Sequence, residues 1–174
     1  MRLYKQTLRA VVIGLVVLGA IGCASVPTTT ASLDAEAKKF VPEPGNGSIY
    51  LDRGSGVAYA LYKADFLLDG RMAGSLGNGF FLLLSVPPGE HVVVPRPVST
   101  QSYGLFNNPG PQWENAQKIN VEGGKNYFYE VNYSVGMAHQ QVHLQELTEE
   151  QGRASVLKSQ RAISTDIVMT PPTQ

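Results

Sequence analysis

The sequence excludes an intrachain disulfide, because Cys23 is the only cysteine among its 174 residues. It also lacks any surplus of basic residues, with 14 Lys and Arg against 14 Asp and Glu, which argues against nucleic acid as a partner. Nucleophile-elbow, phosphate-loop and dinucleotide-binding motifs are missing as well. These absences remove the enzyme classes that such motifs identify, and we expect no cofactor.

Long apolar runs are also missing, apart from residues 10–22 near the N-terminus. This run has the length of a signal-peptide core and is too short to span a bilayer comfortably. It follows a basic start formed by Arg2, Lys5 and Arg9, and it ends in small residues directly before Cys23. The order of these features predicts a signal peptide over residues 1–22 and argues against a buried core helix.

Residues 18–23, Leu-Gly-Ala-Ile-Gly-Cys, resemble the lipobox of bacterial lipoproteins, although Ala20 stands where leucine is commonest. The resemblance implies that Cys23 receives a thioether-linked diacylglycerol and becomes the first residue of the mature chain. Two or more acyl chains, palmitate among them, would anchor the chain stably in a membrane. Because Ala24 and not aspartate follows, the resemblance further implies the outer membrane of a Gram-negative cell, with the body facing the periplasm. The alternative is a free thiol in a secreted protein, which is uncommon.

The mature chain has a composition that predicts one domain. Removal of residues 1–22 takes away three basic residues and no acids, so the formal charge changes from 0 to −3. Residues 23–46 are rich in Thr, Ser, Ala and Pro, which predicts a flexible tether with at most one helical turn at 34–39. We expect the domain over residues 47–164 and a loose tail over 165–174.

Alternating apolar and polar residues predict strands throughout this domain. The alternation over 57–69 indicates one half-buried strand, and Asp69-Gly70 then predicts a tight hairpin turn. The apolar run 79–86 stops at Pro87-Pro88-Gly89, which we expect to be a hairpin connection to the next strand.

Local sequence patterns also predict the last strands and one helix. Residues 125–135 and 140–147 alternate, and Thr148 has the properties of an N-cap for one short C-terminal helix. Seven or eight strands without βαβ alternation predict a mainly β fold, an antiparallel β-sandwich or a small open barrel.

Several turn motifs recur in one known family. Ile49 to Arg53 reads Ile-Tyr-hydrophobic-x-Arg, and it is followed by a Leu-Asp-Gly turn, by Pro-Gly-Glu-His at 88–91 and by Gly-x-x-Tyr at 124–127. Over residues 40–150 the chain resembles a family of Gram-negative lipoproteins catalogued only as a domain of unknown function. It is also similar to small carbohydrate-associated surface β-domains. Neither resemblance implies an activity.

The longest stretch without a strand pattern, residues 99–116, holds the best binding candidates. Tyr103, Phe106 and Trp113 could stack on sugar rings or anchor a partner protein. The alternative is that these rings fold back as a lid over the end of the sandwich and bury their own area.

Catalytic and metal chemistry are less favoured by the sequence. His139 and His143 could share a metal ion on a helix, but a strand would hold them about 13 Å apart. His91 follows a turn, where we expect its ring to bond a backbone carbonyl. Asp52, Asp65 and Asp69 are interpreted as ordinary charges, with no pair spaced for glycosidase chemistry.

We therefore predict a lipid-anchored, non-enzymatic envelope protein that binds a partner protein or a glycan, or that serves as a structural subunit of an envelope complex. The alternative is an envelope hydrolase acting on glycan or ester substrates through His91 or a carboxylate.

Overall fold

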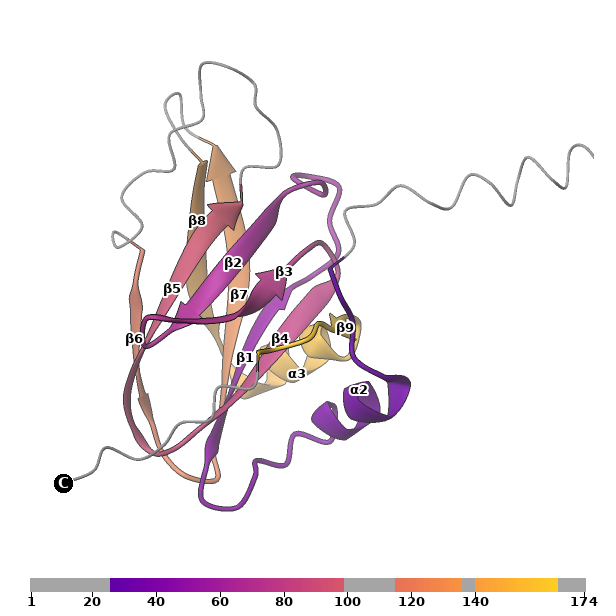
Figure 1. The fold of residues 1–174 in the computed structure, drawn as a ribbon. Helices are drawn as coiled ribbons and strands as arrows, with labels where there is room; N and C mark the ends of the chain where they lie inside the picture. The colour runs from indigo at the N-terminus through magenta and orange to yellow at the C-terminus, as the bar shows by residue number, and fades with distance from the viewer. Residues whose placement is uncertain (1–25, 99–114, 136–139, 166–174) are drawn as a thin grey trace, which may run out of the picture.

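The computed structural model describes residues 26–98, 115–135 and 140–165. Within them the strands form two sheets, and two short helices lie on the same side of the larger sheet (Figure 1). The five-stranded sheet has the order β8-β7-β1-β4-β9, and the four-stranded sheet has the order β3-β2-β5-β6. The bounds are β1 Gly47–Arg53, β2 Lys63–Leu68, β3 Arg71–Leu76, β4 Phe80–Val86, β5 Gly89–Val98, β6 Gln117–Val121, β7 Asn126–Val135, β8 Gln140–Leu147 and β9 Gln160–Arg161, with helices α2 Ala31–Ala37 and α3 Glu149–Val156.

The main core lies between the two sheets and follows the alternation of the sequence. On β2, Ala64, Phe66 and Leu68 are buried, while the residues between them are only partly buried. On β7, Tyr129 and Val131 point into the same core. Successive side chains of a strand point to opposite faces, so each strand gives one face to this core. The predicted mainly β sandwich is confirmed.

The pairing is mixed rather than wholly antiparallel. β1 pairs antiparallel with β4 on one side and parallel with β7 on the other, and the two-residue β9 pairs parallel with β4. The expected hairpin at residues 87–89 is wrong, because β4 and β5 belong to different sheets and the turn carries the chain from one to the other. The expected strand over 57–69 forms only from Lys63, since residues 57–61 make a turn.

The Asp69-Gly70 turn is confirmed. Leu68 pairs with Arg71, and the two residues between them have φ angles of +49° and +79°. These are the positive values that a two-residue type I′ hairpin requires, and they explain why aspartate and glycine occupy the turn.

Every residue of β1 is buried, because the helices cover the outer face of its sheet. A second cluster forms there from Ala37, Phe40, Tyr50, Phe81, Phe128 and Val156. The Tyr50 hydroxyl donates to the carbonyl of Ala37 over 2.9 Å, which ties the end of α2 to the sheet. Tyr50 and Phe128 stack with their ring centroids 5.0 Å apart.

Helix α3 begins at the predicted N-cap. The Thr148 hydroxyl accepts from the backbone N–H of Gln151, and the Gln151 side chain accepts in return from the N–H of Thr148. Gly152 rests directly on β7, where an added Cβ would lie 2.2 Å from the ring of Phe128. The glycine therefore lets the helix approach the sheet closely. Among the described residues, no helix has the length and apolar character needed to cross a bilayer.

The expectation of a flexible tether over residues 23–46 is wrong from Val26 onward. Val26, Ala37 and Phe40 are buried, and residues 31–37 form helix α2 with Thr30 as its N-cap. The composition of this segment resembles a linker, but Val26 reaches the main core, and Ala37 and Phe40 reach the outer face of the sheet. At the other end of the described fold, the N–H of Thr165 donates to the carbonyl of Ala73.

Candidate functional site

One end of the sandwich, which we call the loop end, is formed by residues 54–62 and 77–79 and by the strand termini beside them. It is the upper end in Figure 1. β1 and β7 finish there, β2 and β4 begin there, and Val98 of β5 pairs with Lys63. The N–H of Gly56 donates to the Asn78 side chain over 3.0 Å and joins the two loops.

Arg53, the last residue of β1, holds this end together from inside. Its side chain is almost wholly buried, with the residue 4 % exposed. One guanidinium nitrogen donates to the carbonyl of Tyr62 and another to the carbonyl of Tyr59. The guanidinium carbon lies 4.2 Å from the centroid of the Tyr133 ring, which is cation–π geometry. Burial removes water from the Arg53 guanidinium and lowers its pKa. The two carbonyls and the Tyr133 ring take the place of that water around the cation.

Three tyrosine rings contact one another at this end, and one of them, Tyr133, lies over the guanidinium of Arg53. Tyr59 and Tyr62 meet edge to face at 5.6 Å, and Tyr62 lies 6.3 Å from Tyr133. Tyr59 has a φ of +58°, an unusual conformation for an aromatic residue, and Arg53 binds its carbonyl. Burial raises the pKa of Tyr133, whose hydroxyl is buried without a hydrogen-bond partner among the described residues.

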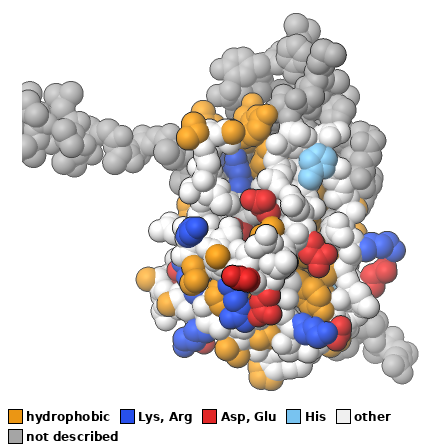
Figure 2. All heavy atoms as spheres, turned by 180° about the vertical axis from the view of Figure 1, so that it is seen from behind, with side chains coloured by type: hydrophobic (Ala, Val, Ile, Leu, Met, Phe, Trp, Pro, Cys, Tyr) orange, Lys and Arg blue, Asp and Glu red, His pale blue; other side chains and the backbone are white. Residues whose placement is uncertain are grey.

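The surface above this cluster is apolar. Val57 is 98 % exposed and Leu61 is 62 % exposed, and Tyr59 presents part of its ring beside them. Figure 2 shows hydrophobic side chains gathered at this upper end of the described surface. Exposed aliphatic and aromatic groups over a rigid base can bind an apolar or aromatic surface of a partner. We call Val57, Tyr59 and Leu61 the apolar tip.

The sequence interpretation missed the apolar tip. Residues 57–61 were assigned to a strand, because their apolar residues fit the alternation of β2. The available signal was Gly54-Ser55-Gly56 directly before them, which breaks the chain after β1. The predicted binding residues Tyr103, Phe106 and Trp113 lie outside the described residues. Their segment follows Val98, so it leaves the fold from the loop end.

His91 lies at the opposite end, where its ring is fully engaged. Nδ1 is 2.7 Å from a carboxylate oxygen of Asp69, and Nε2 is 2.8 Å from the carbonyl of Pro87. The expected bond to a backbone carbonyl is confirmed. Both neighbours are acceptors, so this geometry locks the ring between two turns and offers no free nitrogen to a substrate.

The three aspartates are held by separate structural contacts. Asp65 accepts from the Ser75 hydroxyl at 2.7 Å and from Arg96 at 3.2 Å, and Asp69 also accepts from the N–H of Val92 at 2.8 Å. Asp52 is buried beneath α3, where it accepts from the Ser155 hydroxyl. Burial raises the pKa of Asp52. These contacts join elements of the fold and do not converge on one cavity.

The histidines considered for metal binding are not brought together in the described part. His143 lies on strand β8, with Nε2 3.1 Å from the Ser134 hydroxyl, whereas His139 is outside the described residues. Among residues 26–98, 115–135 and 140–165, no three His, Cys, Asp or Glu side chains are placed to hold an ion. The predicted lipidation site, Cys23, also lies outside these ranges.

Comparison with known proteins gives two matches. An uncharacterized protein of Haemophilus influenzae is 31 % identical over 157 residues, which cover 90 % of this chain and 84 % of that protein. Residues 43–143 match the family described as Protein of unknown function (DUF2846). The matched segment runs from the entry to β1 as far as β8, and so it includes both Arg53 and the apolar tip. The resemblance found in the turn motifs is confirmed, and the chain belongs to this DUF2846 family.

Proposed function

We propose that this chain is an envelope lipoprotein, anchored through a lipid on Cys23, whose β-sandwich binds a partner protein or an envelope glycan without catalysing a reaction. The order of N-terminal features carries the proposal: a basic start, an apolar run, small residues and the lone cysteine. The folded body supports it, because Val26, which is buried and is the first residue that the structure describes, comes three positions after that cysteine. Cleavage before Cys23 would leave the described fold intact.

The anchor would lie in the outer membrane with the body in the periplasm. This part of the proposal rests on Ala24, which is not the aspartate that retains lipoproteins at the inner membrane. Two or more acyl chains on the cysteine would make the attachment stable.

A binding role is favoured over a catalytic one by the contacts of the candidate groups. Both ring nitrogens of His91 face acceptors, and Asp65 is held between Ser75 and Arg96. The apolar tip, in contrast, is exposed and stands on a rigid arginine–tyrosine base. Turnover of a glycan or ester substrate that His91→Ala abolishes would contradict the proposal.

Lipidation is the part to test first. Cells expressing the wild type or Cys23→Ala are labelled with a palmitate analogue, and the purified protein is analysed by intact mass. We expect the wild type to begin at Cys23, to carry acyl chains and to be recovered with outer membranes, and the variant to lose all three properties. A wild-type mass without acyl chains would refute the anchor.

A further inference from the structure

The fold begins almost directly at the proposed lipid anchor. Val26 is only 5 % exposed and belongs to the main core. The carbonyl of Pro27 accepts from the N–H of Ile163 at 2.9 Å, and the N–H of Thr29 donates to the carbonyl of Arg161 at 3.1 Å. Thr28 thereby forms an antiparallel bridge with Ala162. Residues 26–29 are a fixed part of the body.

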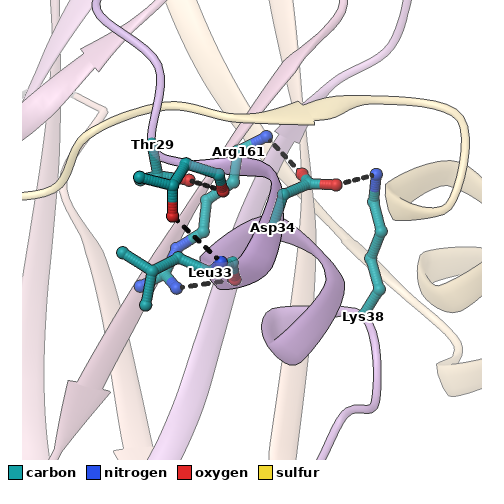
Figure 3. Close-up of polar contacts among 6 residues, drawn as sticks. Thr29, Leu33, Asp34, Lys38 and Arg161 are labelled. Carbon is teal, nitrogen blue, oxygen red and sulfur yellow. Dashed lines mark hydrogen bonds and ion pairs between the residues drawn. The ribbon is translucent and has the colours of Figure 1, made fainter.

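Helix α2 is locked to the same place and cannot serve as a spacer. One carboxylate oxygen of Asp34 accepts from the backbone N–H of Arg161 at 2.8 Å, and the other accepts from Lys38 Nζ at 2.7 Å (Figure 3). A guanidinium nitrogen of Arg161 donates to the carbonyl of Leu33 at 3.2 Å. Release of this segment as a longer tether would also expose the buried Val26 and Phe40.

The chain between the proposed lipid anchor at Cys23 and the folded body at Val26 is short. Three residue steps from Cys23 to Val26 span at most about 11 Å. The diacylglycerol would hold Cys23 at the glycerol level, beneath a headgroup layer that is about 5–8 Å thick on each side of a bilayer. A free tether of residues 23–46 would instead have an end-to-end distance of about 25–30 Å. The body therefore has little room to turn away from the membrane.

The surface around this entry point suits a lipid headgroup layer. Leu33 and Ile163 are each 51 % exposed, and they flank the half-buried cation of Arg161, which donates to the carbonyl of Leu33. The nearby carboxylate of Asp34 is already paired with Lys38. Aliphatic side chains beside a cation match the boundary between acyl chains and phosphates.

We propose that this surface, formed by residues 27–29, Leu33, Arg161 and Ile163 and named here the anchor face, rests on the phospholipid headgroups once Cys23 is acylated. The inference depends on the lipidation proposed above and adds an orientation to it. The strands β6 and β8 are the opposite edges of the two sheets, because β3 and β9 lie beside the anchor face. The sandwich thus lies with one side on the membrane and β6 and β8 directed away from it.

The test uses the lipidated full-length protein in vesicles of phosphatidylethanolamine and phosphatidylglycerol that contain a headgroup spin label. An acylated Cys23 leaves no thiol, so Ile163→Cys and Leu33→Cys place single fluorescent probes on the anchor face. Lys118→Cys is the matched control, exposed on the distant β6. We expect strong quenching at residues 163 and 33 and little at residue 118. Circular dichroism checks the fold of each variant.

A second variant tests the spacing. A Gly/Ser insertion of about 20 residues before Val26 adds a mean reach of about 25 Å. We expect the quenching at residue 163 to be lost while the intact mass still shows acyl chains. Quenching at 163 no stronger than at 118, or quenching that survives the insertion, overturns the inference when the acyl chains are present. Missing acyl chains instead overturn the proposed function, and the orientation falls with it.

Discussion

The two ends of the sandwich are held together by different means. We call the end of the sandwich opposite the loop end the turn end. There, short turns are joined by hydrogen bonds from side chains that belong to the turns themselves, such as Asp69 and His91. At the loop end, an arginine from β1 reaches the carbonyls of a loop six and nine residues further along the chain. The turn end is therefore held by hydrogen bonds between separate turns, such as that between Asp69 and His91, and the loop end depends on one buried cation. At the loop end Arg53 binds the loop through its backbone carbonyls. The side chains of the loop can therefore face outward, and they form the exposed apolar surface.

The largest expected effect comes from removing that cation. Arg53→Met leaves the carbonyls of Tyr59 and Tyr62 without their donor and the unusual Tyr59 backbone without support. We expect the free energy of unfolding to fall by about 2–3 kcal/mol, measured by urea denaturation.

Arg71→Met is the matched control, because Arg71 is exposed on β3. It should change the unfolding free energy by less than about 0.5 kcal/mol. Limited proteolysis should cut the Arg53→Met protein within residues 54–62. Equal stability of the two variants would mean that Arg53 does not hold the loop end.

A smaller effect is expected at the turn end. A double-mutant cycle with His91→Gln and Asp69→Asn isolates the contact between the two side chains, 2.7 Å apart. Each single variant should lose about 1–2 kcal/mol, and the coupling should be about 1 kcal/mol. Chemical denaturation of all four proteins gives these values. A coupling of zero would assign the stability of this end to backbone pairing alone.

Two tyrosines of β7 sharpen the comparison further. At the turn end, the Tyr127 hydroxyl accepts from the N–H of Glu122 at 2.9 Å, so Tyr127→Phe should cost about 0.5–1 kcal/mol. At the loop end, the Tyr133 hydroxyl is buried without a partner among the described residues, so Tyr133→Phe should be neutral or slightly stabilising. Thermal unfolding of both variants measures the two losses of stability. A larger loss for Tyr133→Phe than for Tyr127→Phe would contradict this interpretation.

Alkaline pH gives an independent measure of the same residue. Burial raises the pKa of Tyr133, so above about pH 10 the unfolded chain releases a proton that the folded chain retains. The stability contributed by the neutral hydroxyl is complete below that pH and is lost as the pH rises further. We expect Tyr133→Phe to unfold less readily than the wild type between pH 10 and 11, in urea titrations at fixed pH.

The smallest effect on stability and the largest on binding are expected at the apolar tip. Val57→Asp with Leu61→Asp changes exposed residues, so the unfolding free energy should stay within about 0.5 kcal/mol. A photo-crosslinking residue at position 59 should give a discrete adduct in intact cells, and the double variant should lose it. Val41→Asp alters another exposed valine, outside the loop end, and should keep the adduct.

The sequence predicts the turn end much better than the loop end, for a physical reason. Asp69-Gly70 and Thr148 are local signals, because turn and cap geometry involve only neighbouring residues. The arginine–tyrosine base requires β1, β7 and the loop after β1 to meet, and residues 57–61, which are all apolar, can be taken for the start of the following strand. Helix α2 was anticipated only as a single helical turn at 34–39, for a related reason. Its composition suits a linker, and only the aromatic outer face of the five-stranded sheet gives Phe40 a place to bury.

The position of β1 sets the order in which this molecule can fold. Its partners are β4, which the chain reaches within about 30 residues, and β7, which lies more than 70 residues further along and pairs in parallel. One partner of β1 is far away in the sequence, so β1 completes its pairing late in folding. Topologies with such distant contacts fold slowly. A chain emerging N-terminus first has both neighbours of its central strand only after Glu130 has appeared. Until then Tyr50 lacks the Phe128 ring on which it stacks and α2 has no complete surface to cover, so the packing of β1 and α2 is completed only when β7 is available.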